Sequence, residues 1–204
     1  GATLAYSGAA QGTEPNIYTR NLATGGLQEF RIRQGEVAEA SAIAWSPDGK
    51  LLASGGPDRV VHIWDTSTGL EIETLKNVVI DNAFTQVYEG PITSLAFSPN
   101  GKWLVSGSED NEGGVKDKTP LIRDTSAWTK QPPVVFQGMN EDVSVLAFAP
   151  DGQTLVAGYD NGDVAVWNFN RQEINQMISG HSQVVTALGF SPFEEALLLS
   201  TGSL

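Results

Sequence analysis

The stretch Ala-Trp-Ser-Pro-Asp-Gly at residues 44–49 recurs three times along this chain of 204 residues. It returns as Ala-Phe-Ser-Pro-Asn-Gly at residues 96–101, as Ala-Phe-Ala-Pro-Asp-Gly at residues 147–152, and in shorter form as Gly-Phe-Ser-Pro at residues 189–192. A phrase that recurs at spacings of about 50, 50 and 40 residues is typical of an array built from one structural unit. The fold is therefore inferred from that unit.

One repeat predicts four short β-strands. In the first clear copy, the apolar residues 41–45 lead into the turn signal Pro-Asp-Gly, in which proline presets φ and glycine accepts a positive φ. A second apolar segment follows at residues 51–55, an alternating segment at residues 60–65, and a fourth segment at residues 70–75. We predict an all-β fold, a β-propeller of four-stranded antiparallel blades.

The composition excludes several classes of function. A formal net charge of -12 gives a field that repels nucleic acid and anionic lipid. The absence of cysteine rules out disulfides and thiolate zinc sites, and no apolar run approaches the roughly 20 residues that span a bilayer. We expect a soluble protein that neither binds nucleic acid nor inserts into a membrane, with the cytoplasm favoured among the compartments.

At its strand ends the chain resembles the WD-repeat (WD40) family of β-propellers. Units of that family carry Gly-His before the first strand and Trp-Asp at the end of the third. Ile63-Trp64-Asp65 and Gly180-His181 match this pattern, whereas Val166-Trp167-Asn168 and Ile122-Arg123-Asp124 match it in part. The resemblance covers about residues 35–204.

The resemblance also implies a polar network within each blade, formed by the Gly-His histidine, a strand Ser or Thr, a turn aspartate and the tryptophan. His181 is expected to meet Ser200 or Thr201. Asp58 stands at the turn where it would serve Trp64, but Glu36 occupies the place of the histidine. Because no copy keeps the full set, we expect blades that are held mainly by apolar packing.

We predict one β-propeller region over residues 1–204, with about four to five blades represented, as in part of a ring of about seven. The predicted units are a partial blade at residues 1–34, blades at residues 35–86, 87–137 and 138–179, and a partial blade at residues 180–204, with about seventeen strands in all. The opening passage resembles the TolB-type propeller repeat, which is also four-stranded. The chain begins at Gly1 and at a second strand, so we expect a processed product whose ring is completed by a further segment or by self-association.

Two excursions interrupt the repeat. The first, residues 77–88, is expected to contain a short extra strand at residues 78–80. The second, residues 109–119, carries Asp110, Glu112 and Asp117, whose oxygens are of the kind that calcium prefers. Their spacing fits no EF-hand loop, so we expect a solvated loop and no metal site.

Candidate catalytic residues are few. His62 and His181 are the two histidines, and we expect His62 to be an ordinary strand residue and His181 to be structural. No Gly-x-Ser-x-Gly elbow and no phosphate-binding glycine loop occurs, so we predict neither a catalytic residue nor a cofactor. Trp128 lies outside the strand pattern and is a candidate for an exposed contact residue.

The resemblance implies a non-catalytic protein-interaction scaffold. In the family, partners usually dock on the face formed by the loops that join fourth to first strands and second to third strands. Here these loops hold Glu36, Asp58, Arg59, Tyr88, Met139, Asn140, Glu141, Asp142, Asp160, Asn161 and His181. Their acidic bias predicts a basic or hydrogen-bonding peptide or protein partner. Two alternatives stay open: a regulatory or gating propeller domain of a hydrolase or other multidomain enzyme, and an assembly of two arcs into one ring.

Overall fold

A computed structural model describes residues 2–8, 16–31, 40–75, 77–80, 83–86, 88, 90–109, 120–128, 133–136, 141–191 and 198–202. These residues form nineteen β-strands joined by turns, and they contain no helix. The predicted all-β fold of four-stranded antiparallel sheets is confirmed.

The strands group into consecutive antiparallel sheets, each in chain order. The β1–β3 sheet contains β1 (Thr3–Gly8), β2 (Asn16–Asn21) and β3 (Leu27–Arg31). The β4–β7 sheet contains β4 (Ala42–Trp45), β5 (Leu51–Gly55), β6 (Val61–Asp65) and β7 (Glu71–Leu75). The β10–β13 sheet contains β10 (Ile92–Phe97), β11 (Trp103–Ser108), β12 (Leu121–Asp124) and β13 (Val134–Val135).

Two further sheets follow toward the end of the chain. The β14–β17 sheet contains β14 (Val143–Phe148), β15 (Thr154–Tyr159), β16 (Asp163–Asn168) and β17 (Glu173–Ser179). The β18–β19 sheet contains β18 (Val185–Phe190) and β19 (Leu198–Gly202).

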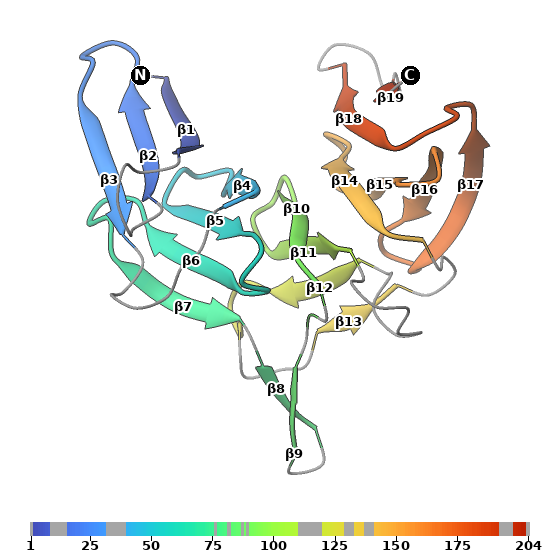
Figure 1. Cartoon of the computed structure of the whole chain (residues 1–204), viewed down its shortest axis with the longest axis horizontal. Coiled ribbons are helices and arrows are strands. Elements are labelled where there is room, and N and C mark those ends of the chain that lie inside the picture. Colours follow the sequence, from blue (N-terminus) through green and yellow to red (C-terminus); the bar gives the residue numbers. More distant parts are fainter. Residues whose placement is uncertain are drawn as a thin grey trace.

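The β8–β9 hairpin is an addition to the repeat. β8 (Asn77–Ile80) pairs with β9 (Ala83–Gln86), and no other described strand joins this two-stranded sheet. Figure 1 shows the hairpin projecting away from the sheets, from the connection between β7 and β10. The strand expected at residues 78–80 is confirmed. Its partner was not predicted, because four residues are too few for an alternating pattern to stand out.

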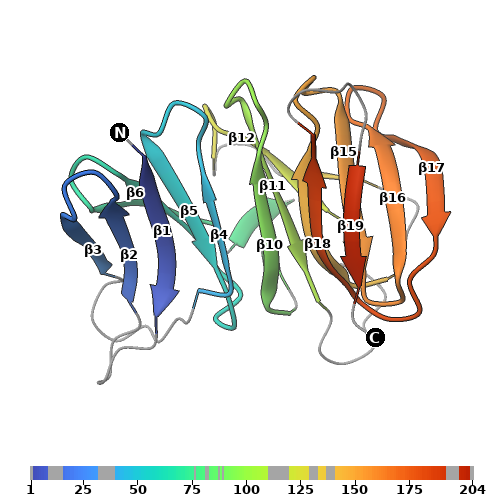
Figure 2. The same cartoon turned by 90° about the horizontal axis from the view of Figure 1, so that it is seen from above.

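The sheets stand side by side in an arc (Figure 1). Strands β4, β10, β14 and β18 line the inner side of the arc, and β7, β13 and β17 lie on its outer side. Strand β10 contacts both β4 and β14, and β14 contacts β18. Figure 2, seen from above, shows the same sheets following one another with their faces together. This is the radial arrangement of propeller blades.

Apolar cores fill the spaces between successive sheets. Between the β1–β3 and β4–β7 sheets, Phe30 meets Trp64 edge-on, with ring centroids 6.1 Å apart. Between the β10–β13 and β14–β17 sheets, Phe136 lies against Trp167, with ring centroids 4.9 Å apart. All four side chains are fully buried, and burying a ring such as phenylalanine contributes about 3 kcal/mol. The tryptophan of each of these third strands is therefore anchored by an aromatic residue of the preceding sheet.

The repeated Pro-Asp-Gly phrase forms the turn between first and second strands. Ser46 Oγ donates a hydrogen bond to Asp48 Oδ1 at 2.7 Å and accepts one from the Leu51 N–H at 2.9 Å. The bond from Ser46 is the main reason that the pKa of Asp48 lies below its ordinary value. Gly49 has a φ of 71°, which a side chain would strain. The phrase is a structural turn at the end of the sheets away from the predicted contact loops.

Candidate interaction face

The loop face is the end of the sheets that carries the turns between second and third strands and the connections from one sheet to the next. It lies opposite to the Pro-Asp-Gly turns, because successive antiparallel strands reverse direction. The structure describes residues 56–60, 90–91, 141–142, 160–162 and 180–184 of this face.

Backbone contacts hold several of these loops in place. The Ile92 N–H donates to the Gly56 carbonyl at 3.0 Å, which links the β10–β13 sheet to the turn of the sheet before it. Within the β14–β17 sheet, the Asp160 N–H donates to the Asp142 carbonyl at 3.1 Å. Between the β14–β17 and β18–β19 sheets, Gly162 lies so close to the His181 carbonyl that no Cβ would fit there. Each loop is therefore held in place by a neighbour.

Seven of the predicted contact residues lie on the described part of this face: Asp58, Arg59, Glu141, Asp142, Asp160, Asn161 and His181. Asp160 and Asn161 are exposed, and the other five are half-buried. Glu36, Met139 and Asn140 lie outside the described residues, as do Asp110, Glu112 and Asp117 of the second excursion.

Tyr88 requires a correction. Its side chain is fully buried, and its hydroxyl shares a hydrogen bond of 2.7 Å with Ser106 Oγ. Tyr88 precedes Ile92 by four residues, as His181 precedes Val185, so it stands in the position of the Gly-His histidine. The tyrosine binds the strand serine as the histidine would. The prediction of a surface contact at Tyr88 is therefore wrong.

His181 occupies the expected structural position. Its Nε2 lies 2.8 Å from Ser200 Oγ, so Ser200 is the partner among the two hydroxyl residues that the sequence offered. The corresponding polar networks of the β4–β7 and β10–β13 sheets contain other residues, and their polar contacts differ from one sheet to the other.

The turn between β5 and β6 has an unusual backbone. Arg59 adopts a φ of 63°, a left-handed conformation that residues other than glycine rarely take. The Arg59 N–H donates to the Gly56 carbonyl at 3.1 Å, and the Val60 N–H donates to Asp58 Oδ1 at 3.2 Å. The Asp58 side chain therefore holds the turn that presents Arg59.

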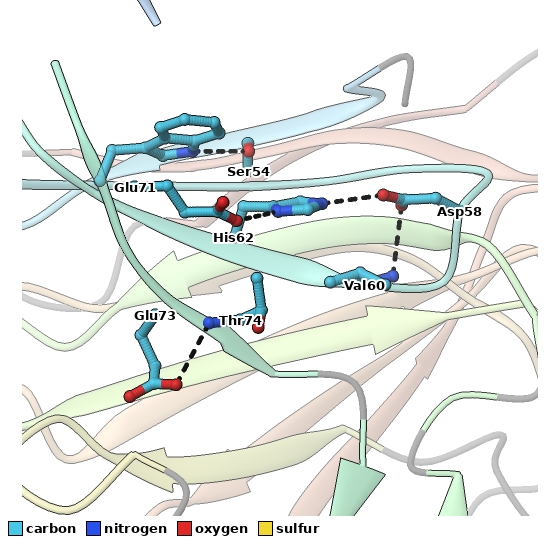
Figure 3. A network of polar contacts seen from close by, with 8 residues as sticks. Ser54, Asp58, Val60, His62, Glu71, Glu73 and Thr74 are labelled. Carbon is cyan, nitrogen blue, oxygen red and sulfur yellow. Dashed lines mark hydrogen bonds and ion pairs between the residues drawn. The ribbon is translucent and has the colours of Figure 1, made fainter. Parts of the chain in front are cut away.

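His62 lies at the centre of a buried group of two carboxylates (Figure 3). Its Nε2 is 2.8 Å from Asp58 Oδ2, and its Nδ1 is 2.5 Å from Glu71 Oε1. The side chains of His62, Asp58 and Glu71 are 1%, 13% and 9% exposed. Burial lowers the pKa of His62, but the hydrogen bonds to Asp58 and Glu71 outweigh it, so the pKa is raised above its ordinary value.

This group was missed in the sequence. His62 was expected to be an ordinary strand residue, and Asp58 was assigned to Trp64. Instead the Trp64 Nε1–H donates to Ser54 Oγ at 2.9 Å, and Asp58 binds His62. The spacing of a turn aspartate four residues before a strand histidine is the signal that was available.

Arg123 replaces the third-strand tryptophan in the β10–β13 sheet. It is 3% exposed, and its Nη1 donates to the Trp128 carbonyl at 3.2 Å. Its Nε and Nη2 have no hydrogen-bond partner in the described part of the chain. Trp128 itself is half-buried and packs against the core beside β10 and β11, so it does not fit the role of an exposed contact residue.

Other kinds of site have little support. Among the described residues, no cluster of three or more His, Asp or Glu side chains could hold a metal ion. A shallow hollow of about 440 Å³ is lined by Thr3, Thr19, Gln28, Trp45, Ser46 and Thr66, at the end of the sheets away from the loop face. The described residues include no helix that is long and apolar enough to cross a membrane.

Comparison with known proteins agrees with this architecture. The family described as WD domain, G-beta repeat matches residues 31–65 and 82–112, and the anaphase-promoting complex subunit 4 WD40 domain matches residues 125–192. A structure described as the mitotic checkpoint complex superposes with a TM-score of 0.77 at 20% identity, covering 98% of this chain and 53% of that chain.

Three curated relatives cover most of this chain. The periodic tryptophan protein 2 homolog of Dictyostelium discoideum is 31% identical over 81% of the chain, and the small ribosomal subunit protein RACK1y of Oryza sativa subsp. japonica is 29% identical over 75%. The cell division cycle 20.1 protein, cofactor of the APC complex, of Arabidopsis thaliana is 25% identical over 91%. The chain spans 16%, 42% and 38% of these relatives, less than half of each. With matching family domains over most of its length and sheets arranged as propeller blades, the chain belongs to the WD-repeat (WD40) family.

Proposed function

We propose that this chain is part of a non-catalytic protein-interaction platform whose partner docks on the loop face. The observation that carries the proposal is the packing of loops from successive sheets against one another, through the Ile92–Gly56 backbone bond and the close approach of Gly162 to the His181 carbonyl. A surface that is ordered before binding loses less conformational entropy when a partner docks. Binding residues also concentrate on loops that a rigid scaffold positions.

The charges on this face support a basic or hydrogen-bonding partner. Glu141, Asp142 and Asp160 contribute carboxylates, whereas Arg59 is the single arginine or lysine among the seven described candidates. The whole chain carries a formal net charge of -12, which adds a long-range attraction for cations. Complementary charge raises the association rate more than it lowers the dissociation rate, so binding should weaken as salt rises.

The names of the relatives are consistent with this role. One relative is named as a small ribosomal subunit protein, another as a cofactor of the APC complex, and the structural neighbour is described as a checkpoint complex. Each of these names places a related protein in a larger assembly. Membership of an assembly is the property that we propose for this chain.

Charge reversal on the loop face tests the proposal. The probe is a short synthetic peptide rich in lysine and arginine, with an acidic peptide of the same length for comparison. We expect the double variant Glu141→Lys and Asp142→Lys to bind the basic peptide about tenfold more weakly, since two exposed ion pairs become repulsive. Binding is measured by calorimetry at two salt concentrations.

The control variant is Glu173→Lys, because Glu173 is exposed at the opposite end of the β14–β17 sheet. This substitution changes the net charge without touching the loop face. An equal loss of affinity in the control and test variants would show that the peptide is attracted by net charge alone and not by the loop face. Unchanged affinity and salt dependence in the double variant would rule out the loop face as the docking surface.

A further inference from the structure

Both nitrogens of the His62 ring face carboxylate oxygens. Nε2 lies 2.8 Å from Asp58 Oδ2, and Nδ1 lies 2.5 Å from Glu71 Oε1 (Figure 3). An ionised carboxylate only accepts hydrogen bonds, so both ring nitrogens must carry a proton for both contacts to be favourable. The observed arrangement is therefore that of an imidazolium ion between two carboxylates.

We infer that His62 is a pH-operated latch: its imidazolium holds the Asp58 carboxylate inside the blade, and loss of one ring proton releases Asp58 to the loop face as an additional acidic contact. This inference rests on the proposed function, because it concerns the same docking surface. The proton passes from the ring to a base in solvent. No covalent bond other than N–H changes, and the charge of the group becomes more negative by one.

The geometry decides which carboxylate is released. The Nδ1 contact with Glu71 is the shorter of the two, so the remaining proton stays on Nδ1 and the lone pair of Nε2 faces Asp58. Glu71 belongs to strand β7, which is paired with β6 along its length. Asp58 belongs to a turn and is the more exposed of the two carboxylates. Repulsion between the Nε2 lone pair and Asp58 is therefore relieved by movement of the turn.

Among the groups around His62, Asp58 and Glu71 are the two that raise its pKa. The third carboxylate nearby, Glu73 on β7, accepts the Thr74 N–H at 3.3 Å (Figure 3). On β5, the residue paired with His62 is the neutral Ser54. The Trp64 ring, on β6 like His62, has its centroid 5.9 Å from that of the His62 ring. On the side of the β1–β3 sheet, the core that Trp64 joins contains Ile17 and Phe30. Charged groups on that sheet whose side chains the structure describes are Arg20 and Glu29, and neither is among the causes of the raised pKa of His62.

Two measurements on the unmodified chain test the latch itself. Nitrogen NMR of the His62 ring should show both nitrogens protonated at about pH 6 and a pKa above the ordinary value of about 6.5. Hydrogen exchange should show the Val60 amide, which donates to Asp58 Oδ1, losing protection as the pH rises through that pKa. A neutral ring at about pH 6 would overturn the inference.

The turn between β15 and β16 is the matched control. Its Asp163 N–H donates to Asn161 Oδ1 at 2.9 Å, in the same local geometry, but no histidine lies in that strand. We expect the ratio of exchange rates between Val60 and Asp163 to rise with pH, which removes the intrinsic pH dependence of exchange. A constant ratio while His62 deprotonates would mean that Glu71 moves instead, and the latch on Asp58 would be wrong.

Peptide binding then separates the latch from the proposed function. The basic probe peptide should bind about two- to fivefold more tightly above the His62 pKa than below it, as one exposed ion pair permits. In Asp58→Asn this increase should disappear. If the turn opens with pH but affinity does not change, the latch stands and the docking surface fails. If affinity changes in Asp58→Asn as in the unmodified chain, Asp58 is not the released contact.

Discussion

Arg123 shows how one residue can work against the packing around it. In the β4–β7 and β14–β17 sheets the equivalent position holds Trp64 and Trp167, both fully buried between blades. Arg123 brings a permanent charge to this place, and among the described residues only the Trp128 carbonyl receives one of its hydrogen bonds. A buried donor without a partner costs about 1–3 kcal/mol.

Replacing this guanidinium by an apolar side chain should therefore stabilise the protein. We expect Arg123→Met to raise the free energy of unfolding by about 1–3 kcal/mol, since methionine fills a similar volume without a charge. Urea unfolding followed by tryptophan fluorescence measures the change. Arg171→Met is the control, because the Arg171 side chain is 74% exposed and should matter little. A loss of stability in Arg123→Met would show that the guanidinium has a partner beyond the described residues.

The sequence allowed some of these residues to be predicted and not others. The contact between His181 and Ser200 follows from the family pattern, and the structure confirms it. Tyr88 was interpreted wrongly, and His62 lies in a strand as predicted but its contacts with two carboxylates were missed. A tyrosine reaches the strand serine across 2.7 Å in one sheet, and a strand histidine reaches the turn aspartate in another. Single-residue patterns do not encode such substitutions.

Between neighbouring elements, glycine in the second strand permits close approach of the next sheet. A Cβ on Gly158 would lie 2.7 Å from Val185 Cβ, and one on Gly55 would lie 2.7 Å from Ile92 Cγ2. A hydroxyl then ties the same sheets together, since Ser144 Oγ donates to the Val185 carbonyl at 2.7 Å and Ser41 Oγ donates to the Ile92 carbonyl at 3.1 Å. The combination of a second-strand glycine and a hydroxyl hydrogen bond therefore recurs from one blade to the next.

A single methyl group should disturb this contact between sheets. We expect Gly158→Ala to lower the free energy of unfolding by about 1–3 kcal/mol, because the β18 strand must move away from β15. Thermal unfolding measures the loss. Gly189→Ala is matched to it, since Gly189 is also a strand glycine but no described atom lies within 4 Å of the place that its Cβ would take. Equal effects of the two substitutions would show that β propensity, not contact between sheets, governs the result.

Strand positions were the most predictable elements. The second and third strands of the β14–β17 sheet each follow a turn signal, and the backbone requirement is strict at Gly152, with a φ of 66°, and at Gly162, with a φ of 92°. Of the β8–β9 hairpin, only β8 was predicted, because nothing in the repeat requires this hairpin. The limits proposed for each blade and the TolB-type character of the first repeat stay predictions.

For the molecule as a whole, the pH dependence near neutral pH involves His62, whose pKa is raised above its ordinary value of about 6.5. Hydrogen bonds from Ser67 and Ser126 lower the pKa of Asp65 and Asp124, which moves both carboxyl groups further from neutral pH. Of these three groups, His62 is therefore the one that changes charge near neutral pH.

The sign of the pH dependence follows from the raised pKa of His62. The folded chain binds this proton more tightly than the unfolded chain does, so the stabilisation is complete below about pH 6.5 and is lost as the pH rises through the folded-state pKa. We expect the melting temperature, measured at constant ionic strength, to fall across this range. Glu71→Gln removes one hydrogen bond that raises the pKa of His62 and should flatten the fall. An unchanged slope in Glu71→Gln would mean that this buried group does not couple protonation to the stability of the whole propeller.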